Sequence, residues 1–337
     1  MKTRSRMLLA VMLVLFGWTA ASNPTVAAEA ETRPVRGHDG LARRSVEFWS
    51  DGTRLAGDVT WPKEFSADKT YPCIVLCHGW GGVKAHLNPQ IGPRFADAGY
   101  IVFTFDYRGW GKSDSRLIVV GEIPEPNEDG LVTVKAKPYR QVVDPRDQQE
   151  DIDAAISFIE GEPMVDVNRI GLWGSSFGGG HVVARAAVDD RPKCIVAQVG
   201  GMDAHASVAA EPMASAVEQD RIKRARGELA SFPSPEEAEQ PPGLVGTPFY
   251  SKFKDFRPAE DAKQVKVPTL IIDAALEHYF DNKDNGHKAY TYIKENAPAE
   301  YHELEGVKHY DVYRDPTLKT VMKLELAWFD KYLKGAE

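Results

Sequence analysis

Short apolar runs alternate with helical patterns along most of this chain, which has 337 residues. The first four runs occupy residues 73–77, 101–105, 170–173 and 194–199. Continuous apolar runs of this length are typical of strands that are covered on both faces. Helical patterns lie between them; residues 148–160, for example, place Ile152 and Ile156 on one face. Strands that alternate with helices predict βαβ units and a parallel sheet.

The two ends of this pattern extend the predicted sheet. Residues 44–49 and 54–61 alternate polar and apolar positions on either side of Asp51 and Gly52, which is typical of a β-hairpin. A later strand–helix–strand–helix cycle occupies residues 267–273, 285–295, 300–304 and 317–332. We therefore expect an α/β fold with a doubly wound, mostly parallel sheet and an antiparallel hairpin at its N-terminal edge.

The first 28 residues have the three parts of a secretory signal peptide. Lys2, Arg4 and Arg6 precede an apolar run at residues 7–18, and the sequence V-A-A precedes Glu29. A membrane-spanning helix needs about 20 apolar residues, so this run is too short to be one, although an uncleaved anchor is the alternative. We expect cleavage after residue 28, export to the periplasm or the extracellular space, and no stable membrane anchor after processing.

The remaining chain divides into a leader and one large domain. Residues 29–41 are rich in charge and glycine and predict a flexible leader, while residues 42–337 carry the α/β pattern. Two segments interrupt that pattern: residues 114–146, which contain several prolines, and residues 203–260, which are charged and include a helical stretch at 214–229. Loops of this length are usually functional or disordered. Because the second segment lies between two strands, we expect it to form a helical lid over a site.

The charge and the cysteines exclude several kinds of partner. The formal net charge is −8, and removal of the three cations in residues 1–28 takes it to −11. A net acidic balance argues against nucleic acid or an anionic membrane as the partner. Cys73 and Cys77 would lie about 13 Å apart in an extended strand, beyond the limit of about 7 Å for a disulfide. Together with Cys194 they form no C-x-x-C pair, so we expect no metal site.

The segment G-S-S-F-G-G at residues 174–179 matches the pattern G-x-S-x-G between a predicted strand and a predicted helix. That context is typical of a nucleophile elbow, a sharp turn that exposes a serine hydroxyl. Gly174 and Gly178 remove the side chains that would collide in such a turn, and the helix dipole favours negative charge near Ser176. A glycine-rich turn without chemistry is the alternative. The flanking strand and helix favour Ser176 as a nucleophile.

A second glycine-rich turn, H-G-W-G-G at residues 78–82, directly follows the run at residues 73–77. In nucleophile-elbow enzymes this loop supplies one backbone N–H to the oxyanion hole, and the residue after the nucleophile supplies the other. The corresponding donors here are the amides of Trp80 and Phe177. The position of His78 in this loop favours a role in shaping the turn over a role as the catalytic base.

A serine hydroxyl needs a base, and the base needs a carboxylate that orients it. Among nine histidines, His309 is the best placed, because it follows the last predicted strand and precedes the last predicted helix. The acid is expected between Ser176 and His309 in chain order. Our first choice is Glu277, since functional groups collect at the carboxyl ends of parallel strands. The alternatives, in order, are Asp281, which could simply cap the following helix, then Asp273 and Asp203.

These segments together resemble the α/β-hydrolase superfamily. The resemblance rests on residues 78–82, residues 106–113 (D-Y-R-G-W-G-K-S), residues 174–179 and His309, in matching order, and it covers roughly residues 44–335. Within the superfamily, the stretch I-D-A-A-L-E-H-Y-F-D-N around Glu277 is similar to the acid loop of the branch that contains dienelactone hydrolases and polyketide transferases. The resemblance implies an eight-stranded sheet, a Ser–acid–His triad and no cofactor.

The chain departs from that branch at two positions. Dienelactone hydrolases proper use cysteine as the nucleophile where this chain has Ser176, and the usual acid of the family is aspartate where this chain has Glu277. Glutamate is an accepted triad acid. The segment G-K-S at residues 111–113 resembles the end of a P-loop, but that motif needs glycine where the chain has Asp106. Nucleotide binding is therefore not expected.

These residues predict a serine hydrolase that cleaves a carboxylic ester of a small molecule through an acyl-enzyme intermediate. Alternatives on the same triad are an acyl transferase or thioester hydrolase, an amide or carbamate hydrolase, and a peptidase, because one fold supports many reactions. A non-catalytic binding module is a further alternative. Such modules lose the serine or the histidine, and this chain keeps Ser176 and His309. The oligomeric state stays open.

Overall fold

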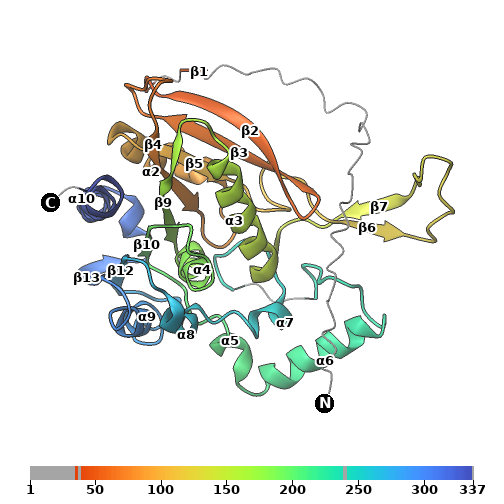
Figure 1. Cartoon of the computed structure of the whole chain (residues 1–337). Helices are drawn as coiled ribbons and strands as arrows, with labels where there is room; N and C mark the ends of the chain where they lie inside the picture. Colours follow the sequence, from red (N-terminus) through yellow and green to blue (C-terminus); the bar gives the residue numbers. More distant parts are fainter. Residues whose placement is uncertain (1–34, 37–38, 238–240, 336–337) are drawn as a thin grey trace, which may run out of the picture. The chain divides into compact units, whose positions relative to one another are not determined.

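A nine-stranded sheet lies at the centre of the structure (Figure 1). The structure is a computed structural model that describes residues 35–36, 39–237 and 241–335. In spatial order its strands are β1 (Val35–Arg36), β2 (Ala42–Ser50), β3 (Thr53–Trp61), β5 (Ile101–Phe105), β4 (Tyr71–Cys77), β9 (Val165–Ser175), β10 (Cys194–Gln198), β12 (Thr269–Leu276) and β13 (Ala299–Lys308). The strands from β5 to β13 are parallel, and β2 and β3 form an antiparallel hairpin. The expected mostly parallel sheet is confirmed; among its nine strands, the short β1 is the one that the sequence did not predict.

The strand β4 explains why the central strands are apolar throughout. It pairs in parallel with β5 at one edge and with β9 at the other, and a hydrophobic core covers each of its two faces. Successive side chains point to opposite faces: Cys73 and Val75 belong to the core on one face, while Ile74 and Leu76 belong to the core on the other. A polar residue at any of these positions would be buried without water.

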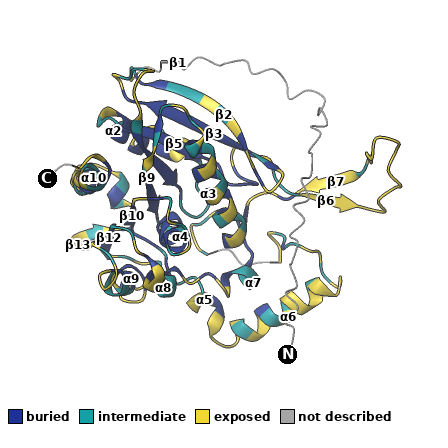
Figure 2. Cartoon of the chain, in the orientation of Figure 1, coloured by how far each residue is buried: buried dark blue, intermediate teal, exposed yellow. Residues whose placement is uncertain are grey.

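Helices cover both faces of the sheet (Figures 1 and 2). One core is closed by α3 (Pro145–Glu160), α4 (Phe177–Ala186), α8 (Pro258–Asp261) and α9 (Gly286–Ile293), and the other by α1 (Lys84–Leu87), α2 (Ile91–Asp97) and α10 (Thr317–Phe329). The start of α3 follows its sequence: the Asp144 carboxylate accepts hydrogen bonds from the amides of Arg146 and Asp147, and Pro145 occupies the first turn. The short helical turns are η1 (Ala262–Gln264), η2 (Asp311–Tyr313) and the π-helical η3 (Asp330–Lys334).

A buried acid of α10 predicts a pH dependence of the stability. Glu325 is fully buried and accepts a hydrogen bond of 2.7 Å from the Trp173 indole, and burial raises its pKa to about 8. The unfolded chain loses this proton near pH 4 to 5, so the stabilisation is complete below that range and is lost as the pH rises toward 8. The substitution Glu325→Gln keeps an oxygen that accepts the Trp173 hydrogen bond, but the glutamine side chain does not ionise. In chemical denaturation, the free energy of unfolding of the variant minus that of the wild type should increase from pH 5 to pH 8; a constant difference would contradict this.

Two insertions leave the sheet where the sequence predicts them (Figure 1). The first contains the strands β6 (Leu117–Val120), β7 (Lys135–Pro138) and β8 (Val142–Val143). The second contains α5 (Ala206–Ala209), α6 (Met213–Ala225), β11 (Thr247–Pro248) and α7 (Tyr250–Phe253). The two insertions are joined by the parallel pairing of β8 with β11, and β6 pairs with β7 in a separate two-stranded sheet. The second insertion contains helices, and its role as a lid over a site stays a prediction.

The structure does not test the prediction of an N-terminal signal peptide. The described residues between 35 and 335 form one compact unit, and the predicted signal peptide at residues 1–28 lies outside the described residues. In the described part of the chain, no helix is long and apolar enough to span a membrane. The same residues contain no cluster of three or more metal-binding side chains. Cys73, Cys77 and Cys194 are buried free cysteines.

Candidate active site

Ser176 lies at the turn between β9 and α4, in a conformation that few residues adopt. Its φ is +57° and its ψ is −126°, and its backbone is held by hydrogen bonds with Gln198 and Gly201 beside it. The flanking glycines are required by close backbone approach: a Cβ on Gly174 would lie 2.1 Å from the Gly178 carbonyl oxygen. A Cβ on Gly178 would lie 2.2 Å from the carbonyl oxygen of Cys77. The sequence G-x-S-x-G therefore folds into the sharp strand-to-helix turn that it predicts.

The topology of the sheet brings His309 and Glu277 to Ser176. Glu277 directly follows β12 and His309 directly follows β13, and these parallel strands are neighbours. Their carboxyl ends meet at the edge of the sheet where β9 delivers Ser176. His309 Nε2 lies 3.1 Å from Ser176 Oγ, and His309 Nδ1 lies 2.6 Å from Glu277 Oε2. The three side chains thus form one hydrogen-bonded chain, although they are far apart in the sequence.

The electrostatics of this chain of groups fix the tautomer of His309. Burial alone would raise the pKa of Glu277, but the hydrogen bonds from His309 and from the amides of Tyr279 and His278 hold its pKa below the ordinary value. The ionised carboxylate accepts the proton on Nδ1, which leaves Nε2 as an acceptor for the Ser176 hydroxyl. The side chains of His309 and Glu277 are 2% and 3% exposed, so water competes little for these bonds.

Two backbone amides lie beside the serine. Phe177 is the first residue of α4, where an amide has no partner within the helix. Gly79 packs so closely on the nucleophile that a Cβ there would lie 2.8 Å from the Cβ of Ser176, and this brings the loop with Trp80 against the turn. In the described part of the chain, neither the Trp80 nor the Phe177 amide donates a hydrogen bond outside regular secondary structure. Both are thus available to an oxygen that develops negative charge next to Ser176.

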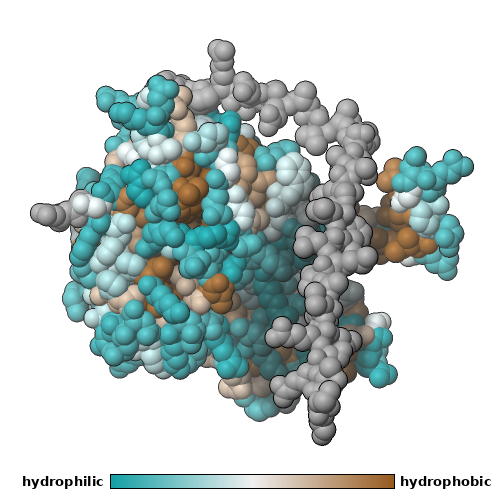
Figure 3. All heavy atoms as spheres, in the orientation of Figure 1, coloured by the Kyte–Doolittle hydropathy of each residue, from teal (hydrophilic) through white to brown (hydrophobic). Residues whose placement is uncertain are grey.

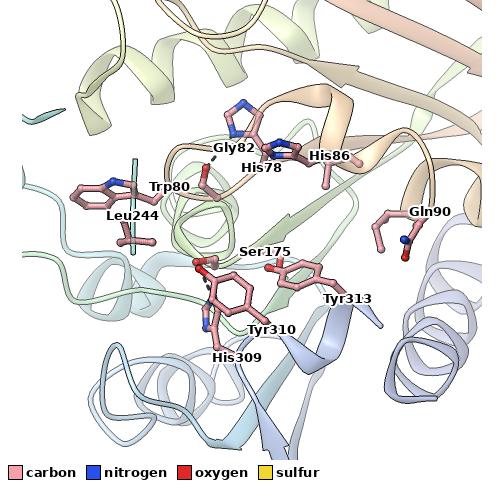
Figure 4. A pocket seen from close by; sticks show the side chains of 14 residues that line it. His78, Trp80, Gly82, His86, Gln90, Ser175, Leu244, His309, Tyr310 and Tyr313 are labelled. Carbon is pink, nitrogen blue, oxygen red and sulfur yellow. Dashed lines mark hydrogen bonds between the residues drawn. The ribbon is translucent and has the colours of Figure 1, made fainter. Parts of the chain in front are cut away.

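Two cavities meet at Ser176. The first has a volume of about 280 Å³ and borders His309; it is lined by His78, His86, Gln90, Ser175, Tyr310 and Tyr313 among others (Figure 4). We call it the imidazole-side cavity. The second, which we call the aromatic cavity, has a volume of about 230 Å³ and is lined mainly by Phe177, Tyr250, Phe253, Tyr279 and Phe280. Trp80, Ser176 and Leu244 border both cavities, and Leu244 comes from the lid insertion. A substrate at Ser176 can therefore extend in two chemically different directions.

A family model for the alpha/beta hydrolase family matches residues 74–321, about three-quarters of the chain. The chain belongs to this family. The match spans the nucleophile turn, the loop with Trp80, Glu277 and His309, so the family assignment and the site geometry concern the same residues.

Relatives in the family carry several kinds of name. An uncharacterised 31.7 kDa protein of the traX-finO intergenic region of Escherichia coli is 30% identical over 287 residues, which cover 78% of this chain and 92% of that protein. The polyketide transferase grgF of Penicillium sp. is 29% identical over 190 residues, 56% of this chain and 55% of the relative. The crystal structure of GrgF has the same fold, with a TM-score of 0.64 at 20% identity and coverage of 87% and 99%. Est1E of Butyrivibrio proteoclasticus with bound ferulic acid matches at a TM-score of 0.62 and 15% identity, with coverage of 86% and 99%.

The other candidate acids lie away from His309 or cannot serve it. The Asp281 carboxylate accepts a hydrogen bond from the Lys283 amide at 2.9 Å and faces solvent, as a capping residue does. Asp273 is buried within β12, and burial raises its pKa to about 8, so this carboxyl is neutral at pH 7. The Asp203 carboxylate lies against the Ala206 amide and borders the aromatic cavity. Among the four carboxylates considered, the structure brings Glu277 to the imidazole.

His78 has the place in the loop that its sequence position predicts. Its Nδ1 donates to the Gly79 carbonyl oxygen at 3.0 Å, and its ring packs on Tyr107 with 4.4 Å between centroids. Burial lowers the pKa of His78 to about 4, so the ring is neutral and can pack against apolar groups. It shapes the turn before Trp80, while the hydrogen bond to Ser176 comes from His309.

Sequence reasoning missed the aromatic side chains that surround the imidazole. The rings of Tyr279 and Tyr310 each lie 5.0 Å from the His309 ring, and their hydroxyls are 3.0 Å apart. Tyr313 is also at the site, where its hydroxyl lies 2.6 Å from Ser175 Oγ. All three tyrosines are within four residues of Glu277 or His309 in the sequence. That proximity was the only available signal, because aromatic residues in loops have many other uses.

Proposed function

We propose that this protein is a serine hydrolase that cleaves carboxylic esters in two steps. The observation that carries the proposal is the hydrogen-bonded chain from Ser176 through His309 to Glu277 at the nucleophile turn. An imidazole that accepts from a serine and donates to a carboxylate is the arrangement that makes the hydroxyl a nucleophile. The family assignment supports a hydrolase, and esterases occur among the proteins of similar fold.

In the first step, Ser176 Oγ attacks the ester carbonyl carbon and its proton passes to His309 Nε2. The carbonyl oxygen becomes an oxyanion, which accepts hydrogen bonds from the amides of Trp80 and Phe177. The C–O bond of the ester then breaks, and the leaving alkoxide takes the proton from His309 as an alcohol. In the second step, water gives a proton to His309 and attacks the acyl group. The acid is released and Ser176 regains its proton.

The two cavities orient the substrate in this proposal. His309 must deliver a proton to the leaving oxygen, so the alcohol part belongs on the side where His309 borders the space, the imidazole-side cavity. The acyl part then extends into the aromatic cavity, whose lining is largely Phe and Tyr side chains. Apolar burial in such a pocket contributes about 0.8 kcal/mol for each methylene. We therefore propose an apolar acyl group and a leaving group that can form hydrogen bonds with His86, Gln90 or Tyr310.

Filling the aromatic cavity should change the acyl-chain preference. Ala204 borders this cavity, and Ala204→Phe adds a ring to it. We expect kcat/KM for p-nitrophenyl octanoate to fall at least about tenfold relative to p-nitrophenyl acetate, because a pocket that loses space rejects the longer chain by about 1.4 kcal/mol or more. His86→Phe, which fills the imidazole-side cavity, is the matched control and should leave this ratio unchanged. If His86→Phe changed the ratio and Ala204→Phe did not, the proposed orientation would be reversed.

Acyl transfer to an acceptor other than water is the second candidate. Relatives named polyketide transferase and acyltransferase favour it, and the imidazole-side cavity beside His309 has room for an alcohol or thiol. Such an acceptor would occupy the place of the leaving group and give its proton to His309. Product analysis distinguishes the two: a hydrolase releases free acid at the rate of ester loss, while a transferase gives the transferred ester when the acceptor is added.

A further inference from the structure

Three polar side chains that the mechanism does not use, Tyr313, Ser175 and Gln198, form a hydrogen-bonded group beside the catalytic residues. We call this group the trio. The Tyr313 hydroxyl lies 2.6 Å from Ser175 Oγ and points toward it in Figure 4. Gln198 Nε2 donates to the same Ser175 oxygen at 2.9 Å. Ser175 and Gln198 are buried, so water competes little for these hydrogen bonds.

Each member of the trio belongs to a different segment of the site. Ser175 is the last residue of β9 and directly precedes the nucleophile. Tyr313 is the last residue of η2 and lies four residues after His309. Gln198 is the last residue of β10, and its carbonyl oxygen accepts a hydrogen bond from the Ser176 amide at 2.9 Å. The trio therefore joins the turn that carries the nucleophile to the loop that carries the base.

The loop of His309 needs such a connection, because it leaves the sheet where β13 ends at Lys308. In the described part of the chain, two side-chain hydrogen bonds join residues 309–313 to the turn at residues 174–179. One is the bond between His309 and Ser176 itself, and the other is the bond between Tyr313 and Ser175. A misplacement of about 1 Å between reacting groups can cost about 100-fold in rate. A fixed distance between loop and turn is thus valuable to a nucleophile that depends on its base.

We propose that Tyr313 and Ser175 are positioning residues whose hydrogen bond sets the distance between His309 Nε2 and Ser176 Oγ. Gln198 holds the Ser175 hydroxyl in the orientation that this bond needs. The inference rests on the proposed function, since it concerns the same nucleophile and base. Burial raises the pKa of Tyr313, so its hydroxyl keeps its proton at neutral pH. Tyr313 and Ser175 also border the imidazole-side cavity, and direct contact with the substrate is therefore the competing role.

The test compares Tyr313→Phe, Ser175→Ala and the double variant with wild type in turnover of p-nitrophenyl acetate. Each single variant should lower kcat and kcat/KM equally, by at least about tenfold, because the bond acts on the geometry of attack and not on binding. KM should therefore stay within about twofold of wild type. The double variant should be at most about twofold slower than the slower single variant, since both substitutions break the same bond.

Tyr100→Phe is the matched control. Tyr100 is also buried, its hydroxyl donates a hydrogen bond of 2.7 Å to Asp330, and it lies outside the linings of both cavities at Ser176. Tyr100→Phe and Tyr313→Phe should each lower the melting temperature by a few degrees, but only Tyr313→Phe should lower kcat. Leu117→Ser is the surface control and should change neither quantity. Leu117 is 67% exposed on the hairpin of β6 and β7, where hydrophobic residues are visible at the surface in Figure 3.

A folded Tyr313→Phe with kcat within about twofold of wild type overturns the inference, and so does an equal loss of kcat in Tyr100→Phe. A rise in KM with unchanged kcat also overturns it, because Tyr313 then binds the substrate. Should Tyr313→Phe fail to fold, Ser175→Ala decides by the same criteria. A wild type that hydrolyses no ester refutes the proposed function alone. The rate of fluorophosphonate labelling of Ser176 then tests the trio, and it should fall at least about tenfold in either single variant.

Discussion

Replacing Ser176 with alanine is expected to lower kcat for ester hydrolysis by about 10⁶-fold, and His309→Ala should have a similar effect. The two side chains act as one unit, because the serine is a weak nucleophile until the imidazole 3.1 Å away accepts its proton. The double variant should therefore be no slower than either single variant. Turnover of p-nitrophenyl acetate, measured at enzyme concentrations high enough to detect residual rates, checks all three variants.

Ser157→Ala provides the matched control for this series. Ser157 is exposed on α3, where it donates to the Asp153 carbonyl oxygen and accepts a hydrogen bond from Arg191. Its replacement should leave turnover within about twofold of wild type, as surface substitutions usually do. If Ser176→Ala kept more than a few per cent of the activity while it remained folded, the nucleophile would have to be another residue.

Glu277→Gln is expected to lower kcat by about 10⁴-fold, the cost of an imidazole that is held in the wrong tautomer. The amide would present an N–H or a neutral oxygen to Nδ1 where the carboxylate now accepts a proton at 2.6 Å. It also removes the negative charge that stabilises the imidazolium formed when Ser176 attacks. Glu277→Asp should lower kcat less than Glu277→Gln, because aspartate keeps the negative charge although its side chain is one methylene shorter.

Asp281→Asn is the comparison that decides between the two acids. The Asp281 carboxylate caps a turn at the Lys283 amide, an interaction that asparagine can keep. We expect near wild-type turnover and a small loss of stability at most. Equal turnover of Glu277→Gln and Asp281→Asn would contradict the assignment of Glu277, and a 10⁴-fold loss in Asp281→Asn alone would transfer the role to Asp281.

The fold was predictable where a local sequence pattern reflects a single strong physical constraint, such as burial on both faces or the absence of room for a side chain. The continuous apolar sequence of β4 and β5 predicted strands covered on both faces, and that is how they lie. The turn at Ser176 was predictable because only glycine fits at positions 174 and 178, where a Cβ would collide with the backbone. His309 was predictable because the chain reaches the same edge of a parallel sheet at the end of every strand.

The remaining features depend on contacts that no local pattern encodes. The choice of Glu277 over Asp281 is a matter of side-chain direction in one loop, and both residues satisfy the rule of chain order. The approach of Leu244 to Ser176 depends on how the lid insertion returns over the sheet. The pairing of β8 with β11 joins segments about a hundred residues apart through two residues each, too few for a recognisable strand. In each case the residues that come together are far apart in the sequence, and no local sequence pattern identifies the contact.

The most direct test of the account is covalent labelling with a fluorophosphonate, followed by peptide mass spectrometry. The account predicts one adduct per chain on Ser176 Oγ with loss of fluoride, no adduct in folded Ser176→Ala, and much slower labelling in His309→Ala. Absence of labelling in folded wild type, or an adduct on a different side chain, would contradict it.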